Sequence, residues 1–450
     1  MMGIVVRTCQ WNVKFYEENE VDELEIVVTH TYICSNCGER YTTADIMYLC
    51  PVDSGVLDIE LDYLDIIRKG WRPERMRPGE MSMWRYSMLL PVEGSFKSHG
   101  ILGSIGGTPL VYVSKLNSNI GERVWIKNDS LLPTGSLKDR ASAVVVSDAI
   151  KRGVDAIMTA STGNAGVALA GMAAAGGLSA VVLVPADAPA SKIAQIVAYG
   201  AEIVLVEGSY SDAYDVAVQA SNELGIYCRN TGYNPFTIEG KKTVAYEICE
   251  QLSDILESSG EAIWKVPDVV IVPVGDGNII SGVYKGFSDL LAIGMVSRMP
   301  KIFGVQAEGS AAIANTYNSG DTVIAEVESN TIADSISADR PADGYRAINA
   351  VRNTGGQYLA VNDDAIEMAV LELSSATGVF AEPSAAVSFA GLRLMQRCEW
   401  INPGDNVVML ITGHGLKTVV ACHVDTEGLS RIKPNLLELT DILKDKNIIA

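Results

Sequence analysis

One lysine and three loops of small residues carry the chemistry that this sequence offers. Lys138 follows a tight Gly-Ser turn and stands at the head of a helical pattern that runs from Ala141 to Lys151. A lysine that burial deprives of water offers a neutral amine, and such an amine forms an imine with an aldehyde. Backbone N–H groups at helix N-termini suit a phosphate or a carboxylate. Loops of this kind follow Lys138 at 161–166, 275–279 and 412–415. Together these features favour a phosphorylated aldehyde as the bound group.

The motifs, taken in order and with a Cys-x-x-Cys segment in front of them, resemble one enzyme family. They are similar to the threonine synthase family of pyridoxal-phosphate (PLP) enzymes, which have the tryptophan-synthase-β-like fold, or fold type II. The resemblance runs from about Cys34 to about Lys417. It implies that Lys138 holds PLP as a Schiff base and, once released, acts as general base for the substrate's α proton. The alternative for Lys138 alone is a surface cation in a charged Lys-Asp-Arg turn; the other loops favour the Schiff base.

The resemblance also assigns roles to two of the loops. It implies that Asn164 hydrogen-bonds the ring hydroxyl of PLP and that Thr412 faces the pyridine nitrogen. A neutral hydroxyl at that nitrogen disfavours transamination and suits elimination and replacement. No role is assigned to His414. The α-carboxylate of the substrate would bind at the N-terminus of the helix that begins near 164, where the residues are also ordinary capping residues. The candidate carboxylate ligands are Ser161, Thr162, Gly163 and Asn164.

A third loop lies between the apolar run 269–274 and a helical pattern over 281–290. A strand, a glycine turn and a helix form a cradle for phosphate, and the resemblance places the phosphate of the cofactor here. The candidate ligands are Gly275, Asp276, Gly277, Asn278 and Ile279. Asp276 is unusual, because the family more often has glycine or asparagine. We expect its side chain to point away or to cap the helix, which leaves the amides to bind phosphate.

The segment expected to hold the phosphate of the substrate departs from the family pattern. Threonine synthases commonly have an arginine where this chain has Thr237, and the segment 230–240 is one residue longer. Ala165 also stands where a hydroxyl often assists. Arginine captures phosphate through two hydrogen bonds, and threonine cannot replace its charge. The nearest cations in the sequence are Lys241, Lys242 and Arg229.

We therefore expect a PLP-dependent lyase or synthase that acts on a small amino acid by elimination or replacement. The first choice is a threonine synthase-type reaction, in which O-phosphohomoserine and water give threonine and phosphate. The alternative is a paralogous β- or γ-replacement on another substituted amino acid. A protein that keeps the fold without catalysis is a second class, and the presence of Lys138, Asn164 and Thr412 together argues against it.

The cysteine segment has the spacing of a metal site. Cys34-x-x-Cys37 and Cys50-x-x-Asp53 resemble half of a zinc ribbon and an altered second half. A carboxylate can ligate zinc, so three cysteines and one aspartate could hold one structural zinc ion. Equally, the segment could have lost its metal and kept its fold. Cys9 is a spare thiol that could substitute as a ligand.

Composition limits the partners of the chain. With a formal net charge of −20, we expect a small-molecule substrate rather than nucleic acid or an anionic membrane as partner. Eight scattered cysteines and no apparent export signal favour a reducing cytoplasm. The longest apolar run, 165–184, reads as a buried helix followed by a buried strand rather than a membrane span. We also expect a homodimer.

The 450 residues are long enough for more than one lobe. From Ile105 onward, short Val/Ile/Leu runs alternate with helical patterns, which indicates an α/β fold with parallel sheets covered on both faces. We expect two doubly wound lobes with a PLP cleft between them. The limits are 1–95 for the N-terminal extension with its cysteine knuckle, 140–230 for the small lobe, and 96–139 with 231–450 for the large lobe. The discontinuity of the large lobe is implied by the resemblance.

Overall fold

The structure is a computed structural model that describes most of the chain. The described residues are 30–43, 48–71, 79–92, 100–161, 163–186, 190–256, 263–421, 436–445 and 448. Cys9 and Thr162, both named above, lie outside these ranges.

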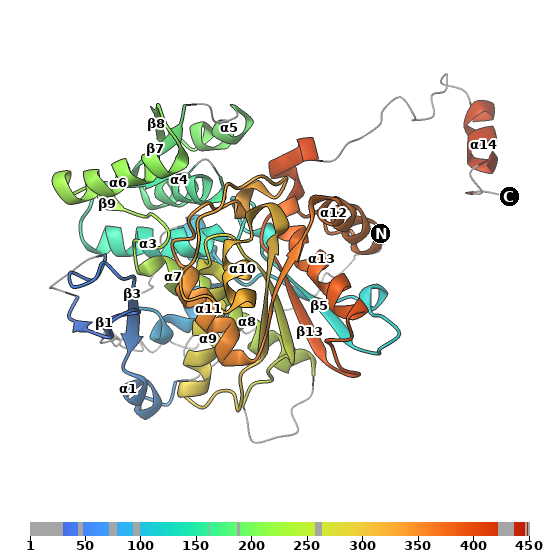
Figure 1. Cartoon of the computed structure of the whole chain (residues 1–450), viewed down its shortest axis with the longest axis horizontal. Helices are drawn as coiled ribbons and strands as arrows, with labels where there is room; N and C mark the ends of the chain where they lie inside the picture. Colours follow the sequence, from blue (N-terminus) through green and yellow to red (C-terminus); the bar gives the residue numbers. More distant parts are fainter. Residues whose placement is uncertain are drawn as a thin grey trace, which may run out of the picture.

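The larger sheet has six strands in the order β12-β11-β10-β13-β5-β4, and all neighbours are parallel except β4, which is antiparallel to β5. Its central strands are apolar and buried, as expected of a parallel sheet with helices on both faces. Figure 1 shows β5 and β13 side by side although they lie far apart in the sequence. The strands are β4 (Leu110–Tyr112), β5 (Arg123–Asn128), β10 (Val269–Pro273), β11 (Lys301–Ala307), β12 (Tyr358–Val361) and β13 (Asn406–Ile411).

The second sheet has four strands in the order β8-β7-β6-β9, all parallel, and lies away from β5 and β13 in Figure 1. All of its strands come from the part of the chain between β5 and β10. The chain therefore leaves the six-stranded sheet, builds the four-stranded sheet and returns. The strands are β6 (Ala156–Ala160), β7 (Ser179–Pro185), β8 (Glu202–Val206) and β9 (Tyr227–Cys228).

Helices connect and cover these strands. The α-helices that concern the site are α3 (Lys138–Lys151), α4 (Asn164–Gly176), α6 (Tyr210–Leu224), α7 (Phe236–Lys241), α9 (Asn278–Ala292) and α13 (Pro383–Arg397). The others are α1 (Tyr63–Arg68), α5 (Ala190–Ala198), α8 (Thr243–Ile255), α10 (Ala312–Ser319), α11 (Gly344–Thr354), α12 (Asp363–Thr377) and α14 (Leu436–Asp445). Short 3₁₀ turns are η1 (Met83–Leu89), η2 (Gly100–Ser104), η3 (Ser114–Leu116), η4 (Asp129–Leu131), η5 (Glu308–Ser310), η6 (Asp334–Ile336) and η7 (Gly415–Ala421).

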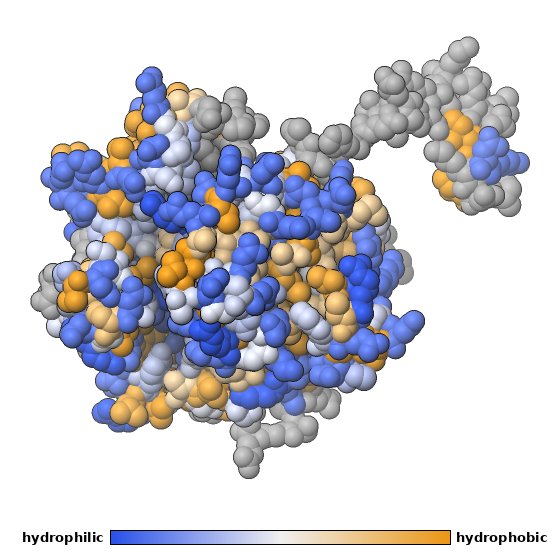
Figure 2. All heavy atoms as spheres, in the orientation of Figure 1, coloured by the Kyte–Doolittle hydropathy of each residue, from blue (hydrophilic) through white to orange (hydrophobic). Residues whose placement is uncertain are grey.

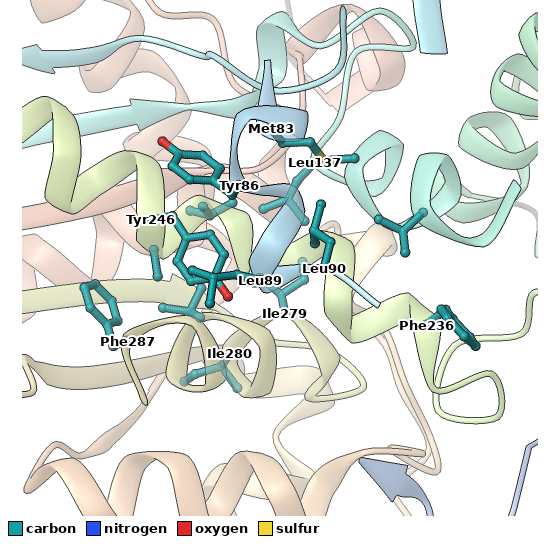
Figure 3. Packing of buried hydrophobic residues seen from close by; sticks show 14 of the residues in the cluster. Met83, Tyr86, Leu89, Leu90, Leu137, Phe236, Tyr246, Ile279, Ile280 and Phe287 are labelled. Carbon is teal, nitrogen blue, oxygen red and sulfur yellow. The ribbon is translucent and has the colours of Figure 1, made fainter. Parts of the chain in front are cut away.

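A small antiparallel sheet precedes these two, with the strand order β2-β1-β3. Its strands are β1 (His30–Cys34), β2 (Arg40–Tyr41) and β3 (Leu57–Leu61). The segment after it packs into the interior, because Met83, Tyr86 and Leu89 on η1 are almost fully buried. Figure 3 shows these side chains beside Leu137 and Ile279 in one core cluster. Leu137 directly precedes Lys138, and Ile279 directly follows Asn278. The core therefore holds two of the candidate loops in place.

The α/β class with parallel sheets is confirmed, and the apolar run 269–274 contains the strand β10. The run 165–184 is a helix and a strand, α4 and β7, and within the described ranges every helix is too short or too polar to cross a membrane. Figure 2 shows hydrophilic and hydrophobic residues interspersed over one face of the molecule. The lobe limits given above stay a prediction.

Candidate active site

Lys138 is the first residue of α3, three residues before the helix start that the sequence pattern predicted. The turn in front of it is held against the loop that follows β13. The Leu137 N–H donates to the carbonyl of Thr412 at 2.9 Å, and the His414 N–H donates to the carbonyl of Gly135 at 3.0 Å. Two loops that lie far apart in the sequence, each containing a predicted site residue, are thus joined by backbone hydrogen bonds.

The amine of Lys138 lies among charges from three other elements. Burial lowers the pKa of Lys138, Asp276 and Glu382 act to raise it, and Arg229 lowers it further. Among the described residues, no carboxylate is within ion-pair distance of this amine. A lysine with a lowered pKa has a larger neutral fraction at pH 7, which is the form that attacks a carbonyl.

Lys-Asp-Arg is not a charged surface turn, because Asp139 and Arg140 are fully buried and Lys138 is half-buried. Asp139 accepts from the N–H of Thr134 at 2.7 Å. Arg140 donates to Asp129 at 2.7 Å and to Glu247 at 2.6 Å. These buried contacts fix the first turn of α3, so that Lys138 directly before them projects from a rigid helix start.

Asn164, the first residue of α4, contacts a residue that the sequence analysis did not single out. Its side-chain amide donates to Glu382 Oε1 at 2.7 Å and to the hydroxyl of Ser335 at 3.3 Å. Burial raises the pKa of Glu382 to about 7, with Lys417 and Asn164 acting in the opposite direction. Gly413 packs directly on this carboxyl, since a Cβ atom there would overlap Glu382. Glu382 therefore links the Asn164 loop to the Thr412 loop.

The loop after β10 has the strand, glycine turn and helix that the sequence predicted. The Asp276 side chain caps the helix, because the N–H of Asn278 donates to Asp276 Oδ1 at 3.0 Å. Burial acts to raise the pKa of Asp276, but the charges of Lys138 and Lys241 lower it overall. The ammonium of Lys241 also donates to the side chain of Asn278. Asp276 thus occupies one amide of the loop, while Lys241 brings its amino group beside the loop.

The candidate carboxylate ligands lie at the carboxyl end of β6. Ser161 and Asn164 are almost fully buried, and the Ser161 hydroxyl accepts from the N–H of Gly163 at 3.2 Å. That amide is therefore already paired in this structure. The remaining candidate, Thr162, lies outside the described residues.

The three cations proposed from the sequence differ in their surroundings. Lys242 is paired with Glu239 at 2.5 Å and with Asp289 at 2.9 Å, so it serves the packing of α7 against α9. Burial lowers the pKa of Lys241 well below its usual value, and Lys138 and Arg229 lower it further. Burial also lowers the pKa of Arg229, to about 10, and Asp276 partly opposes this. Lys241 and Arg229 therefore belong to the group of charges around Lys138, whereas Lys242 does not.

The residues around Lys138 have unused hydrogen-bonding capacity. Within the described part of the chain, three buried atoms there lack a partner: the Ser136 hydroxyl, Arg229 Nη2 and Glu382 Oε2. Buried polar groups are normally paired, so these atoms fit a polar group bound beside the lysine. A neutral amine, a helix N-terminus and nearby cations are the features that a phosphorylated aldehyde requires.

Comparison with known proteins gives this group of residues its context. The profile of the family described as pyridoxal-phosphate dependent enzymes matches residues 101–413. Threonine synthase from Methanocaldococcus jannaschii is 36% identical over 415 residues, which cover 92% of this chain and 99% of that protein. The chain belongs to the threonine synthase family. Threonine synthase from Methanosarcina acetivorans is 35% identical over 85% of this chain and 91% of that protein. This member of the family is a PLP-dependent enzyme, as the sequence motifs predicted.

Solved structures support the same fold. Maize serine racemase superposes with a TM-score of 0.58 at 24% identity and covers 76% of this chain and 93% of its own. Diaminopropionate ammonia lyase from Escherichia coli gives a TM-score of 0.60 at 20% identity over 71% of this chain and 88% of its own. At these identities the likeness establishes fold type II and leaves the substrate open.

The cysteine segment forms a compact cluster outside this site. The ligand atoms of Cys34, Cys37, Cys50 and Asp53 all lie within 4.8 Å of one another. Cys37 Sγ is 3.7 Å from Cys50 Sγ, and Cys34 Sγ is 3.3 Å from Asp53 Oδ1. A Cβ atom at residue 55 would lie 2.6 Å from Cys34 Sγ, so only glycine fits the close approach of Gly55 to the cluster.

Sequence reasoning missed Glu382 and Ser335, and it named Arg229 only by its position in the chain. Glu382 carried a usable signal, because a glutamate directly before the proline that begins α13 is a helix-start residue. Arg229 carried none, since β9 has only two residues and its end is not visible as an apolar run. Among the described residues, Glu382 and Arg229 are each buried with one unpaired polar atom, and this becomes visible only in the fold.

Proposed function

We propose that this enzyme catalyses a threonine synthase-type reaction in which O-phosphohomoserine and water give threonine and phosphate. The observation that supports it most is the 36% identity to the M. jannaschii threonine synthase over almost the whole of both chains. The half-buried Lys138, whose pKa is lowered by the burial of its amine, supports the same chemistry. The alternative is replacement on another substituted amino acid. It is favoured by Thr237, whose hydroxyl already donates to the carbonyl of Asn234 at 2.8 Å.

The residues of the chain have separate tasks in this proposal. The loop from Gly275 to Ile279, with Lys241 beside it, holds the phosphate of the cofactor. Asn164 and Thr412 orient the ring of the cofactor, and the residues after β6 bind the α-carboxylate of the substrate. When bound, PLP withdraws electrons from the substrate and makes its α and β protons acidic. Lys138 takes a proton from each of these two carbons, and phosphate leaves from the γ carbon, which gains a proton in exchange. Water then adds its hydroxyl at the β carbon, the α carbon regains its proton, and the remaining proton leaves with phosphate.

Direct assay tests the reaction. Purified enzyme with PLP is given O-phosphohomoserine, and free phosphate and threonine are measured together. The proposal predicts equal amounts of the two products. If no phosphate is released while another β- or γ-substituted amino acid is turned over, the replacement alternative is correct.

We also propose that Cys34, Cys37, Cys50 and Asp53 bind one structural zinc ion. Tetrahedral zinc with Zn–S bonds of about 2.3 Å requires sulfur atoms about 3.8 Å apart. The 3.7 Å between the sulfur atoms of Cys37 and Cys50 supports this geometry. The hydroxyl of Tyr41 lies 3.1 Å from Cys50 Sγ and could orient that ligand. All four positions are protein ligands, so the ion would serve structure and not catalysis.

A further inference from the structure

We propose that Arg229 binds an anionic group on the side chain of the substrate, which makes the substrate a small amino acid with a phosphate-like β or γ substituent. The proposal rests on the function given above, because it assumes that an amino acid is bound at Lys138. It assigns the charge that Thr237 cannot supply to a residue on a different element.

The position of Arg229 follows from the four-stranded sheet. It comes directly after β9, whose neighbour β6 runs parallel to it and ends just before Ser161. The carboxyl ends of parallel neighbours lie at the same edge of a sheet. The side chain of Asn230 ties these ends together, since its Oδ1 accepts from the N–H of Ala160 at 2.8 Å. Arg229 therefore emerges beside the residues proposed to bind the α-carboxylate.

Two hydrogen bonds hold the guanidinium, one of them against α3, the helix that begins at Lys138. Arg229 Nε donates to the hydroxyl of Ser142 at 3.2 Å, and Nη1 donates to the hydroxyl of Thr231 at 2.7 Å. Ser142 is four residues after Lys138 on α3, so the two side chains share one face of that helix. The guanidinium thus lies along the face of α3 that carries the lysine.

Among the residues that the structure describes, the guanidinium has no acidic partner. Arg229 is fully buried, and within the described part of the chain no carboxylate forms an ion pair with it and Nη2 has no hydrogen-bond partner. Both of its bonds go to neutral hydroxyls. A buried guanidinium normally has a carboxylate or phosphate partner, as Arg140 does here, because an isolated buried charge is costly. An anion that arrives with the substrate would complete the environment of Arg229.

The other cation at the site has a different task. Lys241 is bonded to Asn278 at the start of α9, on the side of the proposed cofactor phosphate. Arg229 comes from the other sheet, on the side of the α-carboxylate ligands. A phosphate held by Arg229 would therefore be separate from the phosphate of PLP.

The test compares two amino acids that differ only in the anion. Norvaline and its δ-phosphonate have the same carbon chain, and the phosphonate imitates phosphohomoserine without a leaving group. Each is titrated into the PLP-loaded enzyme, and the change in cofactor absorbance gives Kd. Loss of a charge-assisted pair weakens binding by about 10- to 100-fold, so the wild type should prefer the phosphonate by this factor.

Variants at Arg229 then identify the source of that preference. In Arg229→Met the two Kd values should converge, while the Kd for norvaline stays at its wild-type value. Arg229→Gln can keep one bond to Ser142 or Thr231 and should behave in the same way if methionine prevents folding. Arg298→Met is the matched control, because Arg298 is a surface arginine paired with Asp268 and should leave both values unchanged.

The possible outcomes separate this proposal from the function on which it rests. Equal affinity of the wild type for both ligands would overturn the role of Arg229 and leave the proposed reaction class intact. Equal weakening of both ligands in Arg229→Met would assign the residue to the α-carboxylate, which also overturns it. If neither ligand nor O-phosphohomoserine changed the cofactor spectrum, the proposed function itself would fail.

Discussion

Asn164 donates to Glu382 Oε1 at 2.7 Å and so joins the first turn of α4 to the first turn of α13. Helix α4 follows β6 of the four-stranded sheet. Helix α13 comes after β12 of the six-stranded sheet, with α12 between them. The second oxygen of Glu382 has no partner within the described residues. The carboxyl group is buried, and Lys138 and Lys417 act on its charge. This single contact couples the candidate loops to a titratable group.

Glu382→Gln should change how stability depends on pH. Burial raises the pKa of Glu382 from 4.5 to about 7 in the folded protein. Between these values the folded state holds a proton that the unfolded state has lost, so wild-type stability falls as pH rises through this window. Glutamine keeps the oxygen that accepts from Asn164 and does not titrate. The free energy of unfolding of the variant, relative to wild type, should therefore rise between about pH 4.5 and pH 7.

The measurement is urea unfolding of both proteins, freed of PLP, at several pH values. The difference in free energy of unfolding between variant and wild type should rise by up to about 1.4 kcal/mol per pH unit. This difference should level off above the raised pKa of Glu382. Comparison with wild type cancels the contribution of Asp139, whose pKa burial also raises to about 7. A difference that does not vary with pH would show that Glu382 titrates normally.

Lys241→Met should weaken the binding of PLP. Its ammonium donates to Asn278 at the start of α9, where the phosphate of the cofactor is proposed to bind. We expect Kd for PLP to rise by about tenfold, since one charge-assisted contact to phosphate is removed. Equilibrium dialysis measures this directly. Lys301→Met, at the exposed start of β11, is the control, and equal effects of the two substitutions would contradict the role of Lys241.

Thr412→Asp should alter the spectrum of the bound cofactor and slow turnover by about tenfold or more, which corresponds to ~1.4 kcal/mol on the barrier. A carboxylate beside the pyridine nitrogen would favour its protonated form, whereas the neutral hydroxyl of Thr412 does not. Thr412→Ser keeps a hydroxyl and should retain the wild-type spectrum. Unchanged kinetics and spectra in Thr412→Asp would show that this side chain does not face the ring.

Zinc should be present at one equivalent per chain and should stabilise the fold. Elemental analysis decides its presence, and chelation should lower Tm while turnover at low temperature persists. Asp53→Cys supplies a fourth thiolate and should hold the ion more tightly, so that a higher chelator concentration is needed. Loss of catalysis on chelation, with the fold and the cofactor spectrum intact, would argue for a catalytic metal instead.

The sequence predicted the parts of the fold that have a periodic or compositional signature. The runs at β6, β10 and β13 are continuous and apolar because parallel strands are buried on both faces, and small residues mark the loops after them. Lys138 could be found because a glycine turn and a helix pattern surround it. The whole-chain resemblance added the role that we assigned to each of these loops.

Pairings between distant residues could not be predicted in this way. Asn164 and Glu382 are 218 positions apart, and nothing in either local pattern points to the other. Two-residue strands such as β9 lack a period, so the placement of Arg229 at a sheet edge was not visible. The buried environment that shifts the pKa values of Lys138 and Glu382 exists only when the loops have come together.

The most direct test of this account is the identity of the lysine that carries PLP. The PLP-loaded enzyme is reduced with borohydride, digested and mapped by mass spectrometry, with Lys138→Ala and Lys241→Met treated in parallel. We expect one pyridoxyl label, on Lys138, which is absent from Lys138→Ala and still present in Lys241→Met. A label on Lys241 or any other lysine in the wild type would contradict the assignment of Lys138, and with it the role of α3 at the centre of the site.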